Sequence, residues 1–256
     1  EYVLNIPPAD KIAGFYMGPD GYTWGRDFLE RHPAPGPRPL VIEKQWYSFM
    51  LWGRLAYDPS LPDAHFERAL ASRHPSASSP HLFRALQGAA QVMPLTTRFF
   101  WGDIDLKWFP EACLSHPRSK GFYTVRHFME GKSMPGEDVL SIAEWRKKIG
   151  AKSPITSQTP PEVAEALEHD ADTTLNLLTA LRLQAATTDK ELTQTLGDYE
   201  AQALLGRYYA SKIRSAIDLA EFNTSADIAA QASALKHAGN ALAHWKQYAA
   251  IYDRQY

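Results

Sequence analysis

The chain has 256 residues, of which 45% are apolar, 22% charged and 12% aromatic, and this is the composition of an ordinary globular protein. A formal net charge of −2 excludes the broad basic field expected of a nucleic-acid-binding protein. The apolar runs are too short for a membrane span. Cys113 is the single cysteine, which excludes an internal disulfide framework and a thiolate zinc cluster.

Residues 1–57 have the pattern of βα units. The apolar stretch 11–18 predicts a buried strand that runs into a turn at Pro19-Asp20-Gly21, and 39–44 predicts a second strand followed directly by a helix over 45–57. Two strands cannot form a sheet with both faces buried, so we interpret them as the final units of a (β/α)8-type barrel. The earlier strands are then expected in an upstream part of the same parent chain. A small local sheet is the alternative.

Residues 58–150 predict an irregular, aromatic-rich helical region. Helical spacing and helix-compatible starts occur over 62–72, 80–92 and 139–149. The stretch 96–123 is dense in aromatic residues and has no clear assignment.

Residues 151–256 predict an antiparallel helical bundle. Fifteen of the eighteen prolines lie before residue 150, and none follows Pro161. Thr159 and Glu162 fit a capping box at the start of a first helix, a second is expected over 189–221, and a third from Thr224. In the third helix the apolar spacing predicts a core face formed by Ile228, Leu235, Leu242, Trp245 and Tyr252. The predicted fold is therefore mainly α with a small α/β N-terminal part.

Candidate catalytic residues stand at the carboxyl ends of the two predicted strands, where barrel enzymes carry their active residues. Asp20 follows the first strand and Glu43 ends the second. Two carboxylates among aromatic and basic groups suit glycoside hydrolysis, in which one acid protonates the leaving oxygen while the other activates water or attacks. Aromatic rings stack on sugar faces, and basic groups pair with a uronate or sulfate. The expected substrate-binding residues are Tyr22, Trp24, Arg26, Lys44, Gln45, Trp46 and Tyr47.

Four of these residues also have a purely structural interpretation. Asp20 fits an Asx turn, Glu43 fits an ion pair with Lys44, and Trp24 and Trp46 fit a packed core. The nine histidines form no HExxH or His-x-His pair, so neither a metal site nor a cofactor is expected.

One segment carries a family resemblance. Trp52-Gly53-Arg54-Leu55-Ala56-Tyr57-Asp58-Pro59-Ser60-Leu61 resembles the Phe-Gly-Arg-Leu-Ala-Trp-Asn-Pro-x-Leu segment of the xylan α-glucuronidases, a glycoside hydrolase family. In that family the segment follows the last barrel strand and leads into a mainly helical C-terminal domain. The resemblance covers about ten residues, which are scaffold in the family. It therefore implies a fold and a broad enzyme type, whereas Asp20 and Glu43 are assigned from strand-end position alone.

Together these features predict the C-terminal part of an α-glucuronidase-like, polysaccharide-degrading glycoside hydrolase. The predicted partner is a polysaccharide or oligosaccharide substrate, and the substrate class favours a periplasmic or extracellular location. Two alternatives stay open. A non-catalytic helical module that binds carbohydrate or protein fits the C-terminal half, and an α-helical polysaccharide lyase fits the aromatic middle.

Overall fold

The computed structural model describes Glu43 and residues 45–101, 123–184 and 189–255. These residues are predominantly helical, which confirms the mainly α fold. The chain divides into two compact units, with the boundary after Pro75. None of the described helices is both long and apolar enough to cross a membrane.

The described part of the first unit contains α2 (Trp46–Tyr57) and α3 (Asp63–Arg73). Both helices were predicted within a residue or two of these bounds. The predicted strand 11–18 lies outside the described residues, as does most of 39–44. Glu43, however, has a helical backbone where the strand was expected. The correction has a local reason, because the apolar run that predicted the strand ends at Ile42 and residues 43–45 are good helix formers.

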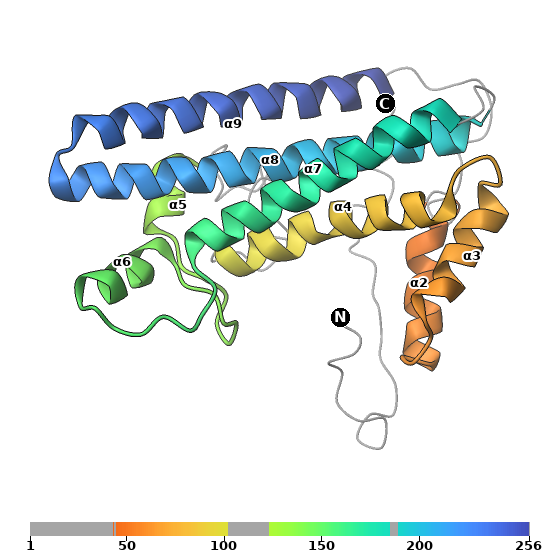
Figure 1. Cartoon of the computed structure of the whole chain (residues 1–256), viewed down its shortest axis with the longest axis horizontal. Helices are drawn as coiled ribbons and strands as arrows, with labels where there is room; N and C mark the ends of the chain where they lie inside the picture. Colours follow the sequence, from red (N-terminus) through yellow and green to blue (C-terminus); the bar gives the residue numbers. More distant parts are fainter. Residues whose placement is uncertain (1–42, 44, 102–122, 185–188, 256) are drawn as a thin grey trace, which may run out of the picture. The chain divides into compact units, whose positions relative to one another are not determined.

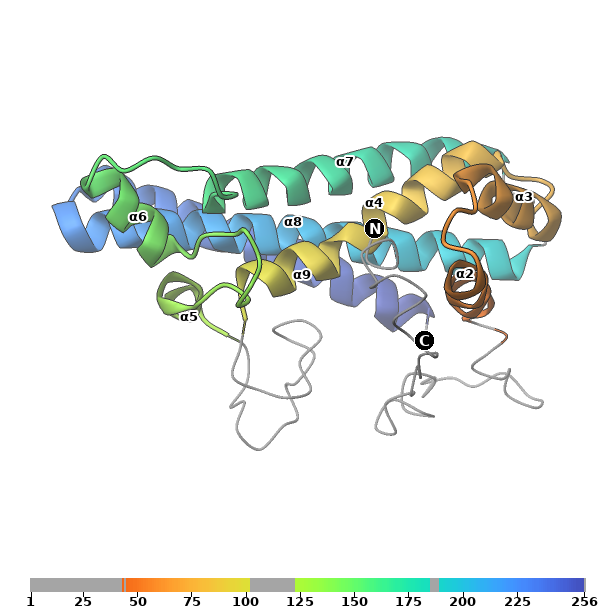
Figure 2. The same ribbon diagram turned by 90° about the horizontal axis from the view of Figure 1, so that it is seen from below.

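The second unit consists, in its described residues, of α4 (Ser79–Phe99), α5 (Val125–Glu130), α6 (Ile142–Gly150), α7 (Pro160–Gln184), α8 (Lys190–Ser225) and α9 (Ile228–Gln255). Helix α8 contacts α4, α5, α6, α7 and α9. Figure 1 shows α9 along one side of α8 and α7 and α4 along the other. Figure 2 shows the short helices α5 and α6 near the end where α8 leads into α9.

Small residues allow three helices to cross closely. A Cβ on Gly88 of α4 would lie 2.5 Å from Thr174 Oγ1 and 2.9 Å from the backbone oxygen of Asp170, both on α7. A Cβ on Gly206 of α8 would lie 3.0 Å from Val92 Cγ2 on α4. Thr174 Oγ1 also donates a hydrogen bond to the Ala85 carbonyl at 3.2 Å. These contacts fix α4, α7 and α8 against one another.

The helix starts largely follow the sequence signals. Glu162 accepts hydrogen bonds at 2.7 Å from both the backbone N–H and the hydroxyl of Thr159, and these bonds lower the pKa of Glu162. Asp189 caps α8 by accepting from the Leu192 N–H at 2.8 Å.

The third bundle helix begins later than predicted. Helix α8 continues to Ser225, and Asp227 accepts from the Ala229 N–H at 2.9 Å at the start of α9.

Two predicted helices in the middle region have different bounds. Helix α4 continues past Val92 and through Pro94, which lies on the exposed side, because Thr96 and Phe99 on the same helix are buried. Packing of those residues outweighs the cost of about 3 kcal/mol for a proline inside a helix. Helix α6 starts only at Ile142, since Val139 forms a β-bridge with Gln158.

The predicted core face of α9 is partly wrong. Ile228, Leu235 and Leu242 are 68%, 70% and 55% exposed. The buried residues of α9 are Ala234, Ala241 and Ile251, and Trp245 and Tyr248 pack partly buried beside them. A single helix packed on one neighbour buries one narrow face, and the close approach of α8 selects the face with the alanines.

We expect Gly88→Ala to lower the free energy of unfolding by about 1–3 kcal/mol, because the new methyl group would overlap the backbone of α7. Gly239→Ala is the matched control, since Gly239 lies inside α9 and a methyl group added there would meet nothing within 4 Å beyond its chain neighbours and the local α9 backbone. It should raise the free energy of unfolding by about 0.5–1 kcal/mol through helix propensity. Urea unfolding measures both, and equal effects of the two variants would contradict the close crossing.

Candidate functional site

The sequence-predicted site lies mostly outside the described residues. Asp20, Tyr22, Trp24, Arg26 and Lys44 are all outside them. The remaining four, Glu43, Gln45, Trp46 and Tyr47, lie at or just before the start of α2, where Glu43 and Gln45 are exposed. The predicted roles of all nine residues therefore stay predictions.

Two of the described residues pack against each other and face α3. The rings of Trp46 and Tyr47 meet edge to face, with centroids 5.3 Å apart, and the Arg73 guanidinium lies 5.5 Å from the Trp46 ring centroid. The Tyr47 hydroxyl is buried and has no hydrogen-bond partner among the described residues. Burial, followed by the nearby charges of Asp63 and Glu67, raises the pKa of Tyr47. Its hydroxyl is thereby held in the neutral form.

A mainly apolar groove of about 560 Å³ overlaps the segment that carries the family resemblance. It is lined by Phe49, Met50, Gly53, Arg54, Tyr57, Asp58, Leu61 and His65. Its one carboxylate, Asp58, accepts hydrogen bonds from the N–H and hydroxyl of Ser60 at 3.0 and 2.6 Å. These bonds lower the pKa of Asp58, which keeps it an ionised turn residue.

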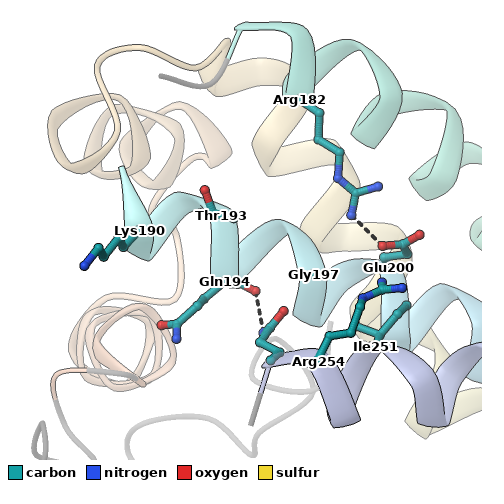
Figure 3. Close-up of a pocket in the computed structure, with 9 residues that line it drawn as sticks. Arg182, Lys190, Thr193, Gln194, Gly197, Glu200, Ile251 and Arg254 are labelled. Carbon is teal, nitrogen blue, oxygen red and sulfur yellow. Dashed lines mark hydrogen bonds and ion pairs between the residues drawn. The ribbon is translucent and has the colours of Figure 1, made fainter. Parts of the chain in front are cut away.

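A second groove, of about 460 Å³, lies in the bundle where α7 ends, α8 begins and α9 ends (Figure 3). The antiparallel order of these helices brings the three termini together. Each contributes one cation: Arg182 in the last turn of α7, Lys190 at the start of α8 and Arg254 in the last turn of α9. We call this feature the bundle-end groove. Thr193, Gln194, Gly197, Glu200, Ile251 and Gln255 complete its lining.

Hydrogen bonds hold the floor of the bundle-end groove. Arg182 Nη2 lies 2.5 Å from Glu200 Oε2, an ion pair between α7 and α8 that Figure 3 draws. Gln255 Nε2 donates to the Gln194 carbonyl and to Asp198 Oδ1, both at 2.9 Å. Gly197 makes room for this amide, because a Cβ there would overlap Gln255 Oε1.

The bundle-end groove is suited to binding and not to hydrolysis. Its lining carries three cations and one carboxylate, whereas glycoside hydrolysis needs two carboxylates facing one bond. Across the described residues, no cluster of three or more metal-ligating side chains occurs. None of the groove's residues was among the site residues predicted from the sequence. The available signal was that basic residues stand at the ends of helices predicted to be antiparallel neighbours.

Charged pairs also join α7 and α8 along the bundle. Arg207 on α8 donates to Asp172 on α7 at 2.8 and 2.6 Å, and Arg214 donates to Glu168. His244 on α9 lies near Arg207, and its Nδ1 is buried without a hydrogen-bond partner in the described structure. Burial and then the Arg207 charge lower the pKa of His244.

Comparison with known proteins gives a fold likeness and no family assignment. The structure resembles part of a GH138 enzyme targeting pectin rhamnogalacturonan II, with a TM-score of 0.68 and 13% sequence identity. The match covers 86% of this chain and 26% of that enzyme, so the chain spans about a quarter of its length. No family model matches the sequence. No curated protein matches it either. At this identity the likeness concerns the fold: a helical arrangement that also occurs within a glycoside hydrolase.

We expect His244 to make folding sensitive to mild acid. Because its folded-state pKa is lowered, the unfolded chain binds the proton more readily, and stability falls as the pH drops below the unfolded value of about 6.5. The charged groups that act on His244 are Arg207 on α8 and Glu168 and Asp172 on α7, and Gln247 on α9 hydrogen-bonds it.

The test is urea unfolding of wild type and His244→Gln between about pH 7 and pH 5, the range that brackets the histidine value. The variant should lose less stability than wild type over this range. His81→Gln, which removes an exposed histidine on α4, should follow the wild-type curve. Parallel curves for wild type and His244→Gln would contradict the assignment.

Proposed function

We propose that this chain is the mainly helical C-terminal part of a polysaccharide-degrading glycoside hydrolase. The observation that carries the proposal is the fold likeness, which extends over 86% of the chain and corresponds to about a quarter of an enzyme described as targeting pectin rhamnogalacturonan II. A likeness of this extent favours a shared arrangement of helices over a chance match of one hairpin.

In this proposal Asp20 and Glu43 supply the acid–base chemistry. One carboxyl group protonates the leaving glycosidic oxygen, and the other activates water or attacks the sugar. Glu43 is exposed immediately before α2, which leaves its carboxylate accessible to a substrate. Tyr22, Trp24 and Trp46 are proposed to stack on sugar rings, while Arg26 and Lys44 pair with a uronate or sulfate group.

The finer proposal is an α-glucuronidase-like specificity. It is supported by the ten-residue resemblance at Trp52–Leu61, which begins within α2, together with the helical chain that follows the segment. Substrates that carry uronic acids are the natural choice for a site with Arg26 and Lys44 beside two carboxylates.

A non-catalytic binding module is the second candidate. The observation that favours it is the bundle-end groove, in which cations from three helices line a cavity that carries a single, ion-paired carboxylate. This candidate places carbohydrate binding in the bundle itself and assigns no hydrolysis to the chain.

We expect Asp20→Asn and Glu43→Gln each to lower kcat by about 10²-fold or more if these carboxylates perform acid–base catalysis. The assay uses the longest natural protein that contains this chain, with glucuronoxylan, rhamnogalacturonan II and neutral polysaccharides as substrates. Release of reducing sugar is measured for wild type and variants.

Glu165→Gln is the matched control, because Glu165 is an exposed carboxylate on α7. It should retain wild-type activity. If wild type cleaves a substrate and both Asp20→Asn and Glu43→Gln cleave it equally well, the two residues are not the catalytic pair. If wild type cleaves none of the substrates, the hydrolase proposal itself fails.

A further inference from the structure

We propose that the bundle-end groove binds the carboxylate groups of an acidic oligosaccharide. The choice of a sugar rests on the proposed function, whereas the choice of an anion rests on the groove itself. The lining has three positive side chains and one negative one, so its formal charge is +2, although the whole chain carries −2. The lining of the groove is therefore positive although the chain as a whole is slightly negative.

Two of the three cations are available to a ligand. Glu200 neutralises Arg182 through their 2.5 Å contact. Lys190 and Arg254 are exposed and form no ion pair within the described part of the chain. Figure 3 shows the Arg254 side chain reaching toward the Arg182–Glu200 pair, whereas Lys190 extends from the start of α8. An anion that binds beside Arg254 would thus contact the Arg254 guanidinium, which has no ion pair, and would lie near the Arg182 guanidinium, which is already paired with Glu200.

Helix stability explains the two arginines but not the lysine. Arg182 and Arg254 stand in the last turns of α7 and α9, where a cation complements the negative end of the helix dipole. Lys190 is the first residue of α8, at the positive end, where the dipole disfavours a cation. The Asp189 carboxylate already caps the Leu192 N–H at this helix start, so the exposed Lys190 ammonium is the group there that would attract an anion in the groove.

The remaining lining suits a sugar better than a small inorganic anion. A volume of about 460 Å³ lies in the range of small-molecule sites and is far larger than a sulfate needs. Thr193 and Gln194 offer a hydroxyl and an amide for sugar hydroxyls, and Ile251 offers an apolar surface for ring C–H groups. A uronic acid residue presents a carboxylate, hydroxyls and an apolar ring face together.

The test is isothermal titration of the 256-residue chain with trigalacturonate, with the uncharged galactotriose and with sodium sulfate. We expect trigalacturonate to bind, the neutral trisaccharide to bind at least about tenfold more weakly, and binding to weaken as the salt concentration rises.

Arg254→Gln and Lys190→Gln should each weaken trigalacturonate binding by about tenfold. Lys236→Gln, which removes an exposed lysine elsewhere on α9, is the matched charge control and should bind as wild type does.

Gly197→Ala tests the shape of the site without changing its charge. The added methyl group would displace the Gln255 amide, which packs on Gly197 at the floor of the groove, so trigalacturonate binding should weaken while thermal unfolding shows that the chain is folded.

The proposal is overturned if trigalacturonate does not bind, or if it binds equally to wild type, Arg254→Gln and Lys190→Gln. Sulfate that competes at the same concentration as trigalacturonate would reduce the groove to a simple anion site and overturn the sugar assignment. These outcomes are separable from failure of the proposed function, because binding is measured without turnover. Activity lost in Asp20→Asn with trigalacturonate binding intact would support both proposals.

Discussion

The fold of the second unit depends on the packing of several helices around α8. Much of this 36-residue helix is buried, and along Ala203–Ile213 nearly every residue is buried. Such a helix cannot be amphipathic in the ordinary sense, because α4, α7 and α9 cover different sides of it. The crossing is close only because Gly88 and Gly206 lack side chains where the backbones approach. Once α8 is fixed, the positions of the other helices follow from the surface each of them shares with it.

An aromatic cluster extends this core to the short helix α5. The Phe128 ring stacks on Phe100 with centroids 4.5 Å apart and lies parallel to Tyr209 of α8. Lys212 is almost fully buried in the same place, and its ammonium donates to the Tyr208 hydroxyl at 2.7 Å and lies 4.5 Å from the Phe128 ring centroid. A buried ammonium is costly without such contacts, so the aromatic faces and the phenol oxygen are what make it tolerable. The cluster therefore holds α5 against α8 through the cation–π contact of Lys212 with Phe128 as well as through buried apolar surface.

The same helix order that builds the core also creates the bundle-end groove. Antiparallel neighbours bring the ends of α7 and α9 beside the start of α8, and basic residues stand at all three termini. All three basic residues stand on helices, and the Arg182–Glu200 ion pair positions one of them; sites on such elements are more precise than sites on loops. Hydrolytic chemistry, in contrast, is proposed for carboxylates near the start of the chain. Binding and catalysis are thus proposed for different segments of the chain.

The sequence by itself determined the helical class, the presence of the long bundle helices and the starts of α7 and α8, because proline, capping residues and apolar spacing act within a few residues of each other. The resemblance at Trp52–Leu61 is, in addition, the sequence feature from which a glycoside hydrolase-type scaffold is proposed. Only tertiary structure decided which face of α9 is buried, since the leucine face and the alanine face have similar periodicity and the closeness of α8 selects the smaller side chains. Tertiary packing likewise keeps α4 helical beyond Pro94. The bundle-end groove belongs to the same category, because its cations lie far apart in sequence and meet only when three helix ends come together.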